Sequence, residues 1–287
     1  MSTAPSSAPA APVWGAHSPS GWRRAWLGLL HTIPARPAFR RLALWLRKPL
    51  KAVFGPWVDI TVWGLRLRVR SQGNLSEQRL LLMPQFLDTA ERLALADALR
   101  GGGNFLDIGA NAGVYSLWVA SLRASGLRVD AFEPDPELCT ALRFNLATNA
   151  LDSVRLHSLA LGASEGEVVL EAGAGNKGEN HITAATAIPP SSAAPTGIRV
   201  PMTTLPVFLA REKLTRIDAL KIDVEGHEVS VLAPLFSGTP RSVWPRLLIC
   251  ELTHDRESRL AALLSENGYT LAARGRLNGI YRLANAV

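Results

Sequence analysis

From residue 104 onward the chain alternates between short apolar segments and segments of helical length, and this alternation restricts the fold more than any other feature. Strands that alternate with helices of this length form a mostly parallel sheet with helices on both faces. The sequence therefore predicts an α/β fold. The predicted strands are 104–108, 128–132, 154–159, 217–223 and 246–251, and the predicted helices are 114–121, 136–149, 228–236 and 258–267.

Three later segments depart from this alternation. Residues 269–273 and 279–283 predict a terminal hairpin, which would add an antiparallel strand to the sheet. Residues 168–171 predict an edge-like strand. The segment 172–198 is rich in Gly, Ala, Pro, Ser and Thr and is long for a connection in a compact domain. It is interpreted as a lid, a substrate wall or a disordered loop.

Composition divides the chain into four regions. Residues 1–20 are rich in Ala, Pro and Ser, lack the features of a secretory signal and predict a disordered tail. Residues 21–54 predict a basic amphipathic helical extension. Residues 55–100 predict a strand pair and a helix, and residues 101–287 predict the core domain.

Positive charge is concentrated in the first quarter of the chain. The first 70 residues contain eleven Lys and Arg residues and one acid, Asp59, whereas the other 217 contain 20 basic and 23 acidic residues. The core is therefore close to neutral, unlike the basic groove that nucleic-acid enzymes often present. Nucleic acid is not the expected partner.

The extension combines apolar residues at helical spacing with basic residues. The apolar residues predicted to share one face are Phe39, Leu42, Leu46, Leu50 and Val53. The opposite face is predicted to hold Arg40, Arg41, Arg47, Lys48 and Lys51. Two interpretations stay open: a helix on an anionic membrane surface, or a helix packed on the core with a solvated basic face. No run of 18 apolar residues predicts a transmembrane helix, so we expect a cytoplasmic protein. Peripheral contact at the inner face of the membrane belongs to the first of the two interpretations.

The first predicted strand of the core ends in the segment Asp107-Ile-Gly-Ala-Asn-Ala-Gly113, which leads into a helix. Gly109 and Gly113 allow a tight turn and close approach of the backbone to a ligand. A dinucleotide site would have a third glycine where Asn111 stands. The carboxylate of Asp107 suits a ligand with positive charge, and S-adenosylmethionine carries an ammonium and a sulfonium.

The second predicted strand ends at Glu133, which lies 20 residues after Gly113. An acid at the end of this strand can accept hydrogen bonds from both ribose hydroxyls of a nucleoside. With the turn after the first strand, Glu133 predicts an S-adenosylmethionine site.

These residues resemble a class I methyltransferase, and further motifs narrow the resemblance to the FkbM methyltransferase family. The motifs are 107–117, 132–136 with Leu142, Asn145, Leu146 and Asn149, Ala160-Leu-Gly162 followed by Gly166, Val200-Pro-Met-Thr-Thr-Leu205, and Asp218-Ala-Leu-Lys-Ile-Asp-Val-Glu-Gly-His-Glu228. The last of these is similar to the family's D-x-x-K-I-D-V-E-G-x-E signature. The resemblance covers 75–285 and does not reach residues 1–54.

The resemblance implies a Rossmann-like, seven-stranded sheet, S-adenosylmethionine as methyl donor, and O-methylation of a small-molecule, natural-product or glycan acceptor. It identifies the donor better than the acceptor. The residues predicted to bind the donor are Asp107, Gly109, Asn111, Gly113, Tyr115, Glu133, Pro134, Ala160 and Asp223.

Candidate catalytic residues lie at the end of the predicted strand 217–223 and in the turn after it. They are Lys221, Asp223, Glu225 and His227. Asp223 is expected to orient the donor or the acceptor, and Glu225 or His227 to accept the acceptor proton. Lys221 could instead neutralise Asp107 or Glu251. Although Asp223, Glu225 and Glu251 carry oxygen ligands, their spacing is that of no known metal motif, and no metal ligands are predicted.

Two other functions stay open from the sequence: methylation of RNA or another macromolecule, and an inactive module that only binds S-adenosylmethionine. Against amino-methylation, Asp223 is followed by Val-Glu-Gly and not by a Pro-Pro-aromatic motif. Against carbon methylation of pyrimidines, Cys139 lies in a predicted helix and Cys250 in a predicted strand, not on a loop. The oligomeric state is not predicted.

Overall fold

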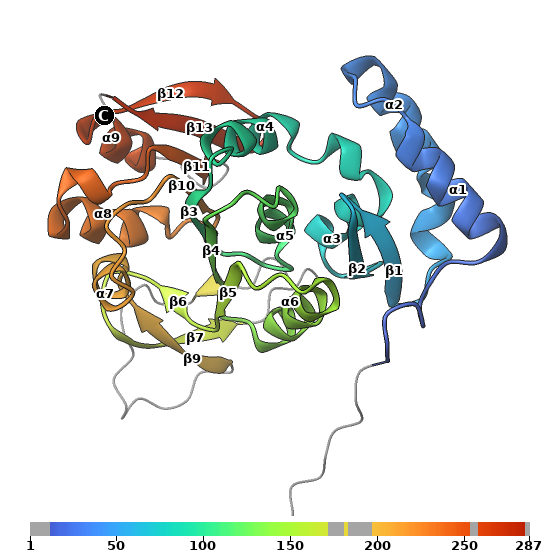
Figure 1. Cartoon of the computed structure of the whole chain (residues 1–287), viewed down its shortest axis with the longest axis horizontal. Coiled ribbons are helices and arrows are strands. Elements are labelled where there is room, and N and C mark those ends of the chain that lie inside the picture. Colours follow the sequence, from blue (N-terminus) through green and yellow to red (C-terminus); the bar gives the residue numbers. More distant parts are fainter. Residues whose placement is uncertain (1–11, 172–180, 183–196, 253–257, 285–287) are drawn as a thin grey trace, which may run out of the picture.

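The computed structural model describes residues 12–171, 181–182, 197–252 and 258–284. Within these residues a seven-stranded sheet has the order β12-β13-β11-β10-β3-β4-β5 (Figure 1). Strands β10, β11, β3, β4 and β5 are parallel, and β13 pairs antiparallel with β11 and with β12. This sheet with its closing hairpin confirms the predicted fold class. The strands are β3 (Gly103–Ile108), β4 (Leu127–Phe132), β5 (Val154–His157), β10 (Ala219–Ile222), β11 (Leu247–Glu251), β12 (Tyr269–Arg274) and β13 (Asn278–Leu283).

Helices cover both faces of this sheet because successive strand residues point to opposite sides. Phe105 joins one apolar cluster, with residues of α4, α5 and α6, whereas the next residue, Leu106, joins a second cluster, with residues of α7, α8 and α9. Both residues are fully buried. The helices are α4 (Thr89–Ala98), α5 (Val114–Ser121), α6 (Pro136–Asn149), α7 (Leu205–Arg211), α8 (Glu228–Gly238) and α9 (Arg259–Glu266), and the 3-10 turn η4 (Arg241–Val243) precedes β11.

A second, four-stranded sheet lies beside the first, in the order β6-β9-β7-β8. Its strands are β6 (Ala160–Leu161), β7 (Gly166–Glu171), β8 (His181–Ile182) and β9 (Ile198–Thr203). The sequence predicted an edge-like strand at 168–171 but not its partner β9, whose residues had been interpreted only as a family motif. Most of the segment 172–198 lies outside the described residues.

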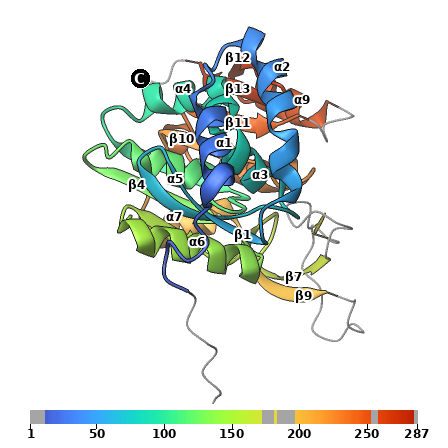
Figure 2. The same ribbon diagram turned by 90° about the vertical axis from the view of Figure 1, so that its right-hand side faces the viewer.

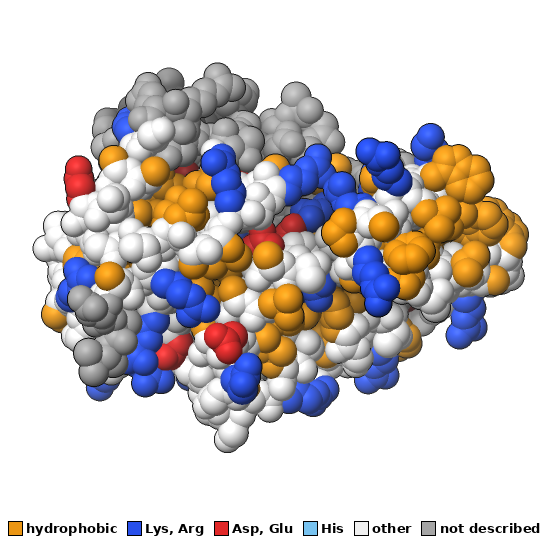
Figure 3. Space-filling model, turned by 90° about the horizontal axis from the view of Figure 1, so that it is seen from above, with side chains coloured by type: hydrophobic (Ala, Val, Ile, Leu, Met, Phe, Trp, Pro, Cys, Tyr) orange, Lys and Arg blue, Asp and Glu red, His pale blue; other side chains and the backbone are white. Residues whose placement is uncertain are grey.

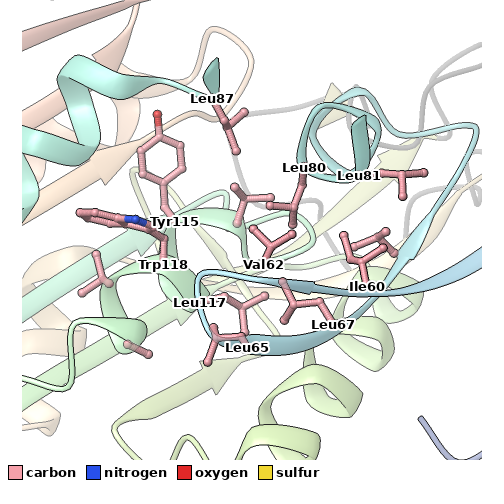
Figure 4. Packing of buried hydrophobic residues seen from close by; sticks show 14 of the residues in the cluster. Ile60, Val62, Leu65, Leu67, Leu80, Leu81, Leu87, Tyr115, Leu117 and Trp118 are labelled. Atoms are coloured by element: carbon pink, nitrogen blue, oxygen red, sulfur yellow. The ribbon is translucent and has the colours of Figure 1, made fainter. Parts of the chain in front are cut away.

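The N-terminal strand pair and the helices after it form one wall of the core. The hairpin of β1 (Trp57–Val62) and β2 (Leu65–Arg70) packs against α3 (Leu75–Leu82) and α5, with Val62, Leu80 and Leu117 among the packed residues (Figure 4). A 3-10 turn, η2 (Pro84–Phe86), divides the single helix predicted in residues 55–100 into α3 and α4.

The side-chain amides of α6 bind the free edge of β2. Asn145 accepts a hydrogen bond from the Arg68 N–H at 2.7 Å and donates one to the Arg68 carbonyl at 3.0 Å. One turn later, Asn149 makes the same pair of hydrogen bonds with Arg66. Two amides thus replace a neighbouring strand, which fixes the hairpin against the core.

The first part of the described chain also contacts this hairpin. The Arg68 guanidinium forms a bidentate ion pair with Asp59 and donates to the Pro12 and Val13 carbonyls. Asp59 in turn accepts from the Gly15 N–H at 2.7 Å. Residues 12–20, which lie in the stretch expected to be a disordered tail, therefore have defined contacts with β1 and β2.

The helical extension consists of α1 (Gly21–Thr32), α2 (Pro37–Leu46) and the 3-10 turn η1 (Lys48–Ala52). It lies against α3 and η2 (Figure 2), where His31 contacts the Leu81 carbonyl at 2.7 Å and Gln85 donates to the Leu30 carbonyl at 2.9 Å. Its buried residues Leu27, Leu30 and Ala43 belong to the same apolar cluster as the core. The extension is therefore packed on the core domain.

The single apolar face predicted for Phe39, Leu42, Leu46, Leu50 and Val53 is not formed. α2 ends at Leu46 and the chain continues as the tighter η1, so residues 39–53 do not share one continuous helical face. The buried residue of α2 is Ala43, whereas Phe39 and Leu42 are exposed. No helix among the described residues is long and apolar enough to cross a membrane.

Candidate active site

A pocket of about 730 Å³ opens where β3, β4, β10 and β11 end. From β3 the chain proceeds to β4 and β5 on one side, and it later returns to β10 on the other side of β3. Ligands of open α/β sheets bind at such a switch point, outside the carboxyl ends of the strands. The volume lies within the range of about 300–1,000 Å³ that is usual for small-molecule sites.

The turn after β3 forms the floor of the pocket. Gly109 has φ 72°, and a Cβ at this position would lie 2.0 Å from the Asp223 carbonyl oxygen. Gly113 has φ 78°, and a Cβ there would lie 2.3 Å from a methyl carbon of Leu142 in α6. Both glycines are required by close packing within the protein, and only Gly109 lines the pocket.

Asn111 connects three elements around this turn. It has φ 54°, a left-handed conformation that Asn adopts more readily than most residues. Its N–H donates to Glu133 Oε2 at 2.7 Å, and its side-chain oxygen accepts from Asn74 Nδ2 at 2.6 Å. Asn111, Glu133 and Pro134, which the sequence predicts to bind the donor, all line the pocket.

The carboxylate of Glu133 is buried at the pocket wall. It accepts hydrogen bonds from the main-chain N–H groups of Asn111 and Asp135 and is only 6% exposed. Burial raises the pKa of Glu133 to about 7, against the opposing effect of the two N–H groups. Because a carboxylate has more acceptor sites than these two bonds occupy, Glu133 can also accept hydroxyl hydrogen bonds from a ligand.

Asp107 lies beneath the pocket and does not line it. The residue is fully buried, and its Oδ2 accepts from the Ser116 N–H at 3.0 Å and from the Ser116 hydroxyl at 2.6 Å. Its Oδ1 has no hydrogen-bond partner among the described residues. Burial raises the pKa of Asp107, although the nearby Lys221 charge opposes this shift. Asp107 therefore anchors α5 and lies beside Lys221 of the neighbouring strand β10.

Lys221 is paired with Asp107 in the register of β10 and β3. Its ammonium lies 3.0 Å from Asp223 Oδ2 and 5.1 Å from the centre of the Tyr115 ring. Burial alone would lower the pKa of Lys221, but the charges of Asp223 and Asp107 outweigh it and raise the pKa. Of the two partners considered from the sequence, Asp107 and Glu251, the structure places Asp107 across the register, and Asp223 is an additional partner.

Tyr115 joins this network from α5. Its hydroxyl donates to Asp88 Oδ2 at 3.1 Å, and burial raises its pKa well above the usual value. Asp88 also forms an ion pair with Arg79, and both acid and arginine line the pocket. Tyr115 is thus held at the pocket wall as a neutral hydrogen-bonding group.

Three carboxylates meet at the rim. Asp223, Glu225 and Glu251 each place one oxygen so that all three lie within 4.8 Å of one another. Glu225 has φ 52°, and the turn is held by the Glu228 carboxylate, which accepts from the Val224 N–H at 3.1 Å and the Gly226 N–H at 3.3 Å. Glu228 is therefore a structural residue that presents Glu225.

Several predicted site residues lie outside this arrangement. His227 is the N-cap residue of α8 and does not line the pocket. Ala160 belongs to β6 and is buried in a small apolar cluster with Val168 and Met202. Asn176 and Asn180 of the segment 172–198, and His254 after β11, lie outside the described residues.

The structure adds lining residues that the sequence analysis missed. Asn74, Arg79 and Asp88 come from the start and end of the α3 region, and Arg40 and Arg47 come from α2 and the residue after it. For Asn74 a local signal exists, because Asn-Leu-Ser-Glu77 is a helix-capping pattern and its side chain accepts from the Glu77 N–H. The arginines carry no such signal.

The sheet order and the site at the ends of β3 and β4 define a Rossmann-like, class I methyltransferase. The profile of the methyltransferase FkbM domain matches residues 107–271, more than half of the chain. This protein therefore belongs to the FkbM methyltransferase family, and it is an S-adenosylmethionine-dependent enzyme. Among curated proteins no sequence matches the chain.

Solved structures with a related fold are distant. An FkbM methyltransferase from Methylobacillus flagellatus KT is 18% identical with a TM-score of 0.40, over 72% of this chain and 54% of that chain. An O-methyltransferase from Bacillus cereus in complex with SAH is 15% identical with a TM-score of 0.40, over 68% and 80%. A SAM-dependent methyltransferase from Agrobacterium tumefaciens is 12% identical with a TM-score of 0.45, over 81% and 71%.

The residues at the strand ends fit S-adenosylmethionine. The buried Glu133 carboxylate is an acceptor for the two ribose hydroxyls, which are hydrogen-bond donors. The carboxylates of Asp223 and Glu225 supply negative charge for a ligand with an ammonium and a sulfonium. Gly109 and Ala110 also line the pocket, and because their side chains are small or absent, a ligand can approach their main chain. The arrangement matches the donor of the family.

Proposed function

We propose that this enzyme methylates a hydroxyl oxygen of a carbohydrate-like or other small natural-product acceptor. The observation that supports the proposal is the group of three carboxylates, Asp223, Glu225 and Glu251. They line the same pocket as Asn111 and Glu133, the predicted donor-binding residues. An alcohol is a weak nucleophile, and a positioned carboxylate that takes its proton assists the transfer.

In this mechanism S-adenosylmethionine supplies a methyl group that is already activated by the sulfonium. Glu133 and the turn around Asn111 hold the donor, and Lys221 fixes Asp223 by the 3.0 Å ion pair. Glu225 accepts the hydroxyl proton while the acceptor oxygen bonds to the methyl carbon and the carbon–sulfur bond breaks. Alignment of oxygen, carbon and sulfur in the bound state lowers the barrier further.

The test is a transfer assay with labelled donor against fractionated cell extract, with mass spectrometry of the product. A methyl ether as product supports the proposal, and a methylated nitrogen or carbon contradicts it. On the identified acceptor we expect Glu225→Gln to lower kcat by about 10²–10⁴-fold with little change in donor affinity. Glu266→Gln, on exposed α9 surface, is the matched control. If His227→Ala lowers kcat and Glu225→Gln does not, His227 is the base.

The same assay addresses a metal. Because the three carboxylate oxygens lie within 4.8 Å of one another, a divalent cation is an alternative activator of the hydroxyl. We expect activity to persist after dialysis against EDTA. Loss of activity that is restored by a divalent cation would indicate that a bound metal ion, and not a carboxylate base, activates the acceptor hydroxyl.

We further propose that the outer surface of α1 and α2 contacts an anionic membrane at its inner, cytoplasmic face. Hydrophobic side chains gather over these helices with Lys and Arg beside them (Figure 3). The exposed apolar residues of these two helices include Trp22, Leu42 and Trp45, which are 56%, 46% and 64% exposed. Exposed tryptophans with flanking basic residues are typical of helices that lie in a membrane interface.

The membrane proposal is tested by co-sedimentation with vesicles that contain phosphatidylglycerol. The full chain is expected to sediment with these vesicles, and Leu42→Ser combined with Trp45→Ser should reduce this fraction at least about fivefold by loss of buried apolar area. Substitution is preferred to removal of residues 1–54, because Leu27, Leu30 and Leu50 belong to the core cluster. Equal sedimentation of both proteins would contradict the proposal.

A further inference from the structure

One wall of the pocket is lined by arginines. Arg40 and Arg47 come from α2 and the residue that follows it, and Arg79 comes from α3. Seen from above, Lys and Arg side chains lie next to Asp and Glu side chains between the N-terminal helices and the rest of the molecule (Figure 3). The pocket therefore has an acidic half at the strands and a basic half at α2.

Arg47 is the least compensated of these charges. It is half-buried, and its only polar side-chain contact within the described ranges is a 4.0 Å contact from Nη1 to Met83 Sδ. Burial lowers the pKa of Arg47, and the like charges of Arg40 and Arg79 lower it further. The positive charge at Arg47 is thus disfavoured until an anion enters the pocket.

The neighbouring arginines differ in this respect. Arg79 forms an ion pair with Asp88 and is neutralised by it. Arg40 is exposed and forms no ion pair in the part of the chain that the structure describes. Two guanidinium groups, Arg40 and Arg47, therefore remain available on the same wall. Their two positive charges are more than a single negative charge would neutralise.

Apolar side chains also line the pocket, among them Leu44 of α2, Met83 and Leu87. A ligand that reaches from Glu225 to Arg47 thus needs a hydroxyl at one end and an anionic group at the other, and its body meets apolar side chains.

We propose that Arg47 and Arg40 bind a phosphate group of the methyl acceptor and so select a phosphorylated acceptor. Arginine binds phosphate through paired N–H donors, and a phosphate carries the charge and oxygens to engage two guanidinium groups. The inference deepens the proposed O-methylation, on which it rests for the position of the reacting hydroxyl.

The direct test does not depend on methyl transfer. Inorganic pyrophosphate is titrated into the full-length protein by calorimetry at low ionic strength, where charge interactions are least screened. Wild type is expected to bind it, Arg47→Gln to bind at least about tenfold more weakly, and Arg47→Lys to lie between. Arg41→Gln is the matched control, because Arg41 is exposed on the same helix and does not line the pocket. Its affinity should equal that of wild type.

Donor affinity in the same proteins separates a local effect from misfolding. Arg47→Gln should bind S-adenosylmethionine like wild type, since no hydrogen bond or ion pair joins Arg47 to the strand-end residues within the described ranges. No pyrophosphate binding by wild type, or equal binding by Arg47→Gln and Arg41→Gln, overturns the anion site. If the anion site is present but the methylated atom is not oxygen, only the proposed O-methylation fails.

The source of the phosphate is tested by competition with bound pyrophosphate. A hexose phosphate that displaces pyrophosphate supports a soluble acceptor, and vesicles of phosphatidylglycerol that displace it support a lipid-linked one. If neither displaces it, the phosphorylated-acceptor class is wrong even though the site binds anions.

Discussion

The acidic and basic halves of the pocket are constructed in different ways. The strand-end half consists of turns that directly follow β3, β4 and β10, and main-chain geometry at Gly109, Asn111 and Glu225 sets its shape. The half at α2 consists of long side chains, including Arg40 and Arg47, from a segment more than fifty residues before β3 in the sequence. The first half suits a ligand shared by a whole family, whereas the second can change with the acceptor while the fold stays the same.

The largest effect is expected where the backbone itself forms the site. Gly109→Ala places a Cβ 2.0 Å from the Asp223 carbonyl, so the turns after β3 and β10 must separate. We expect loss of measurable donor binding and a decrease of more than about 3 kcal/mol in the free energy of unfolding. Calorimetry and urea denaturation measure the two quantities.

The matched control for this prediction is Gly126→Ala. Gly126 also has positive φ, 70°, but no atom lies within 4 Å of the added Cβ. Its cost should be about 1–2 kcal/mol, the conformational penalty alone, with donor binding unchanged. Equal effects of the two substitutions would contradict the role of close packing at Gly109.

A smaller effect is expected at the contact between the start of α3 and the turn after β3. Asn74→Ala removes the 2.6 Å hydrogen bond to Asn111 and the cap of α3. We expect a loss of about 0.5–2 kcal/mol in unfolding free energy and a roughly tenfold weaker donor affinity. Ser20→Ala, at the N-cap of α1 where no side-chain cap bond exists, should change neither quantity. Unchanged donor affinity in Asn74→Ala would show that Asn111 needs no support from α3.

The pH dependence of donor binding should report Glu133. Its ionised form accepts hydroxyl hydrogen bonds best, and its pKa in the free enzyme is raised to about 7. Donor affinity should therefore increase as the pH rises through about 7, by at most about tenfold per pH unit, and then level off. Glu133→Gln should bind the donor more weakly and without this inflection. Calorimetry from pH 6 to pH 8.5 measures both, and an inflection that persists in Glu133→Gln assigns it to another group.

Stability should show the opposite sign for the same group. Because the pKa of Glu133 is higher in the folded state than in the unfolded state, unfolding releases a proton between about pH 4.5 and pH 7. The contribution of Glu133 to stability is present below this window and is lost as the pH rises through it. Urea denaturation of wild type and Glu133→Gln in this window should show the difference.

The smallest effect is expected at Arg276, which lines the pocket near the β12–β13 turn and is exposed. An exposed charge is screened by solvent, so Arg276→Gln should weaken pyrophosphate binding no more than about two- to threefold. An effect as large as that of Arg47→Gln would place the anion site at the hairpin and not at α2.

The sequence by itself predicted those parts of the protein whose conformation is determined by residues close together in the chain. The helices α5 and α6 have the predicted bounds, and the turn 107–113 lies where the strand-end rule places it. Asn111, Glu133 and Asp223 follow directly after buried strands, so their positions depend on local chain geometry and on the order of the strands. Asp107 is an exception, since its burial beneath the pocket depends on the packing of α5.

Only the tertiary structure decided what the remote segments contribute. Periodicity shows which residues share a helical face but not which surface that face meets, and it did not show that Phe39 and Leu42 are exposed whereas Leu50 is buried in the core. The same limit hid Arg47, which has an ordinary place in a basic stretch of the sequence. Its position at the pocket follows from the packing of the extension against α3 and η2, a contact between residues distant in the chain.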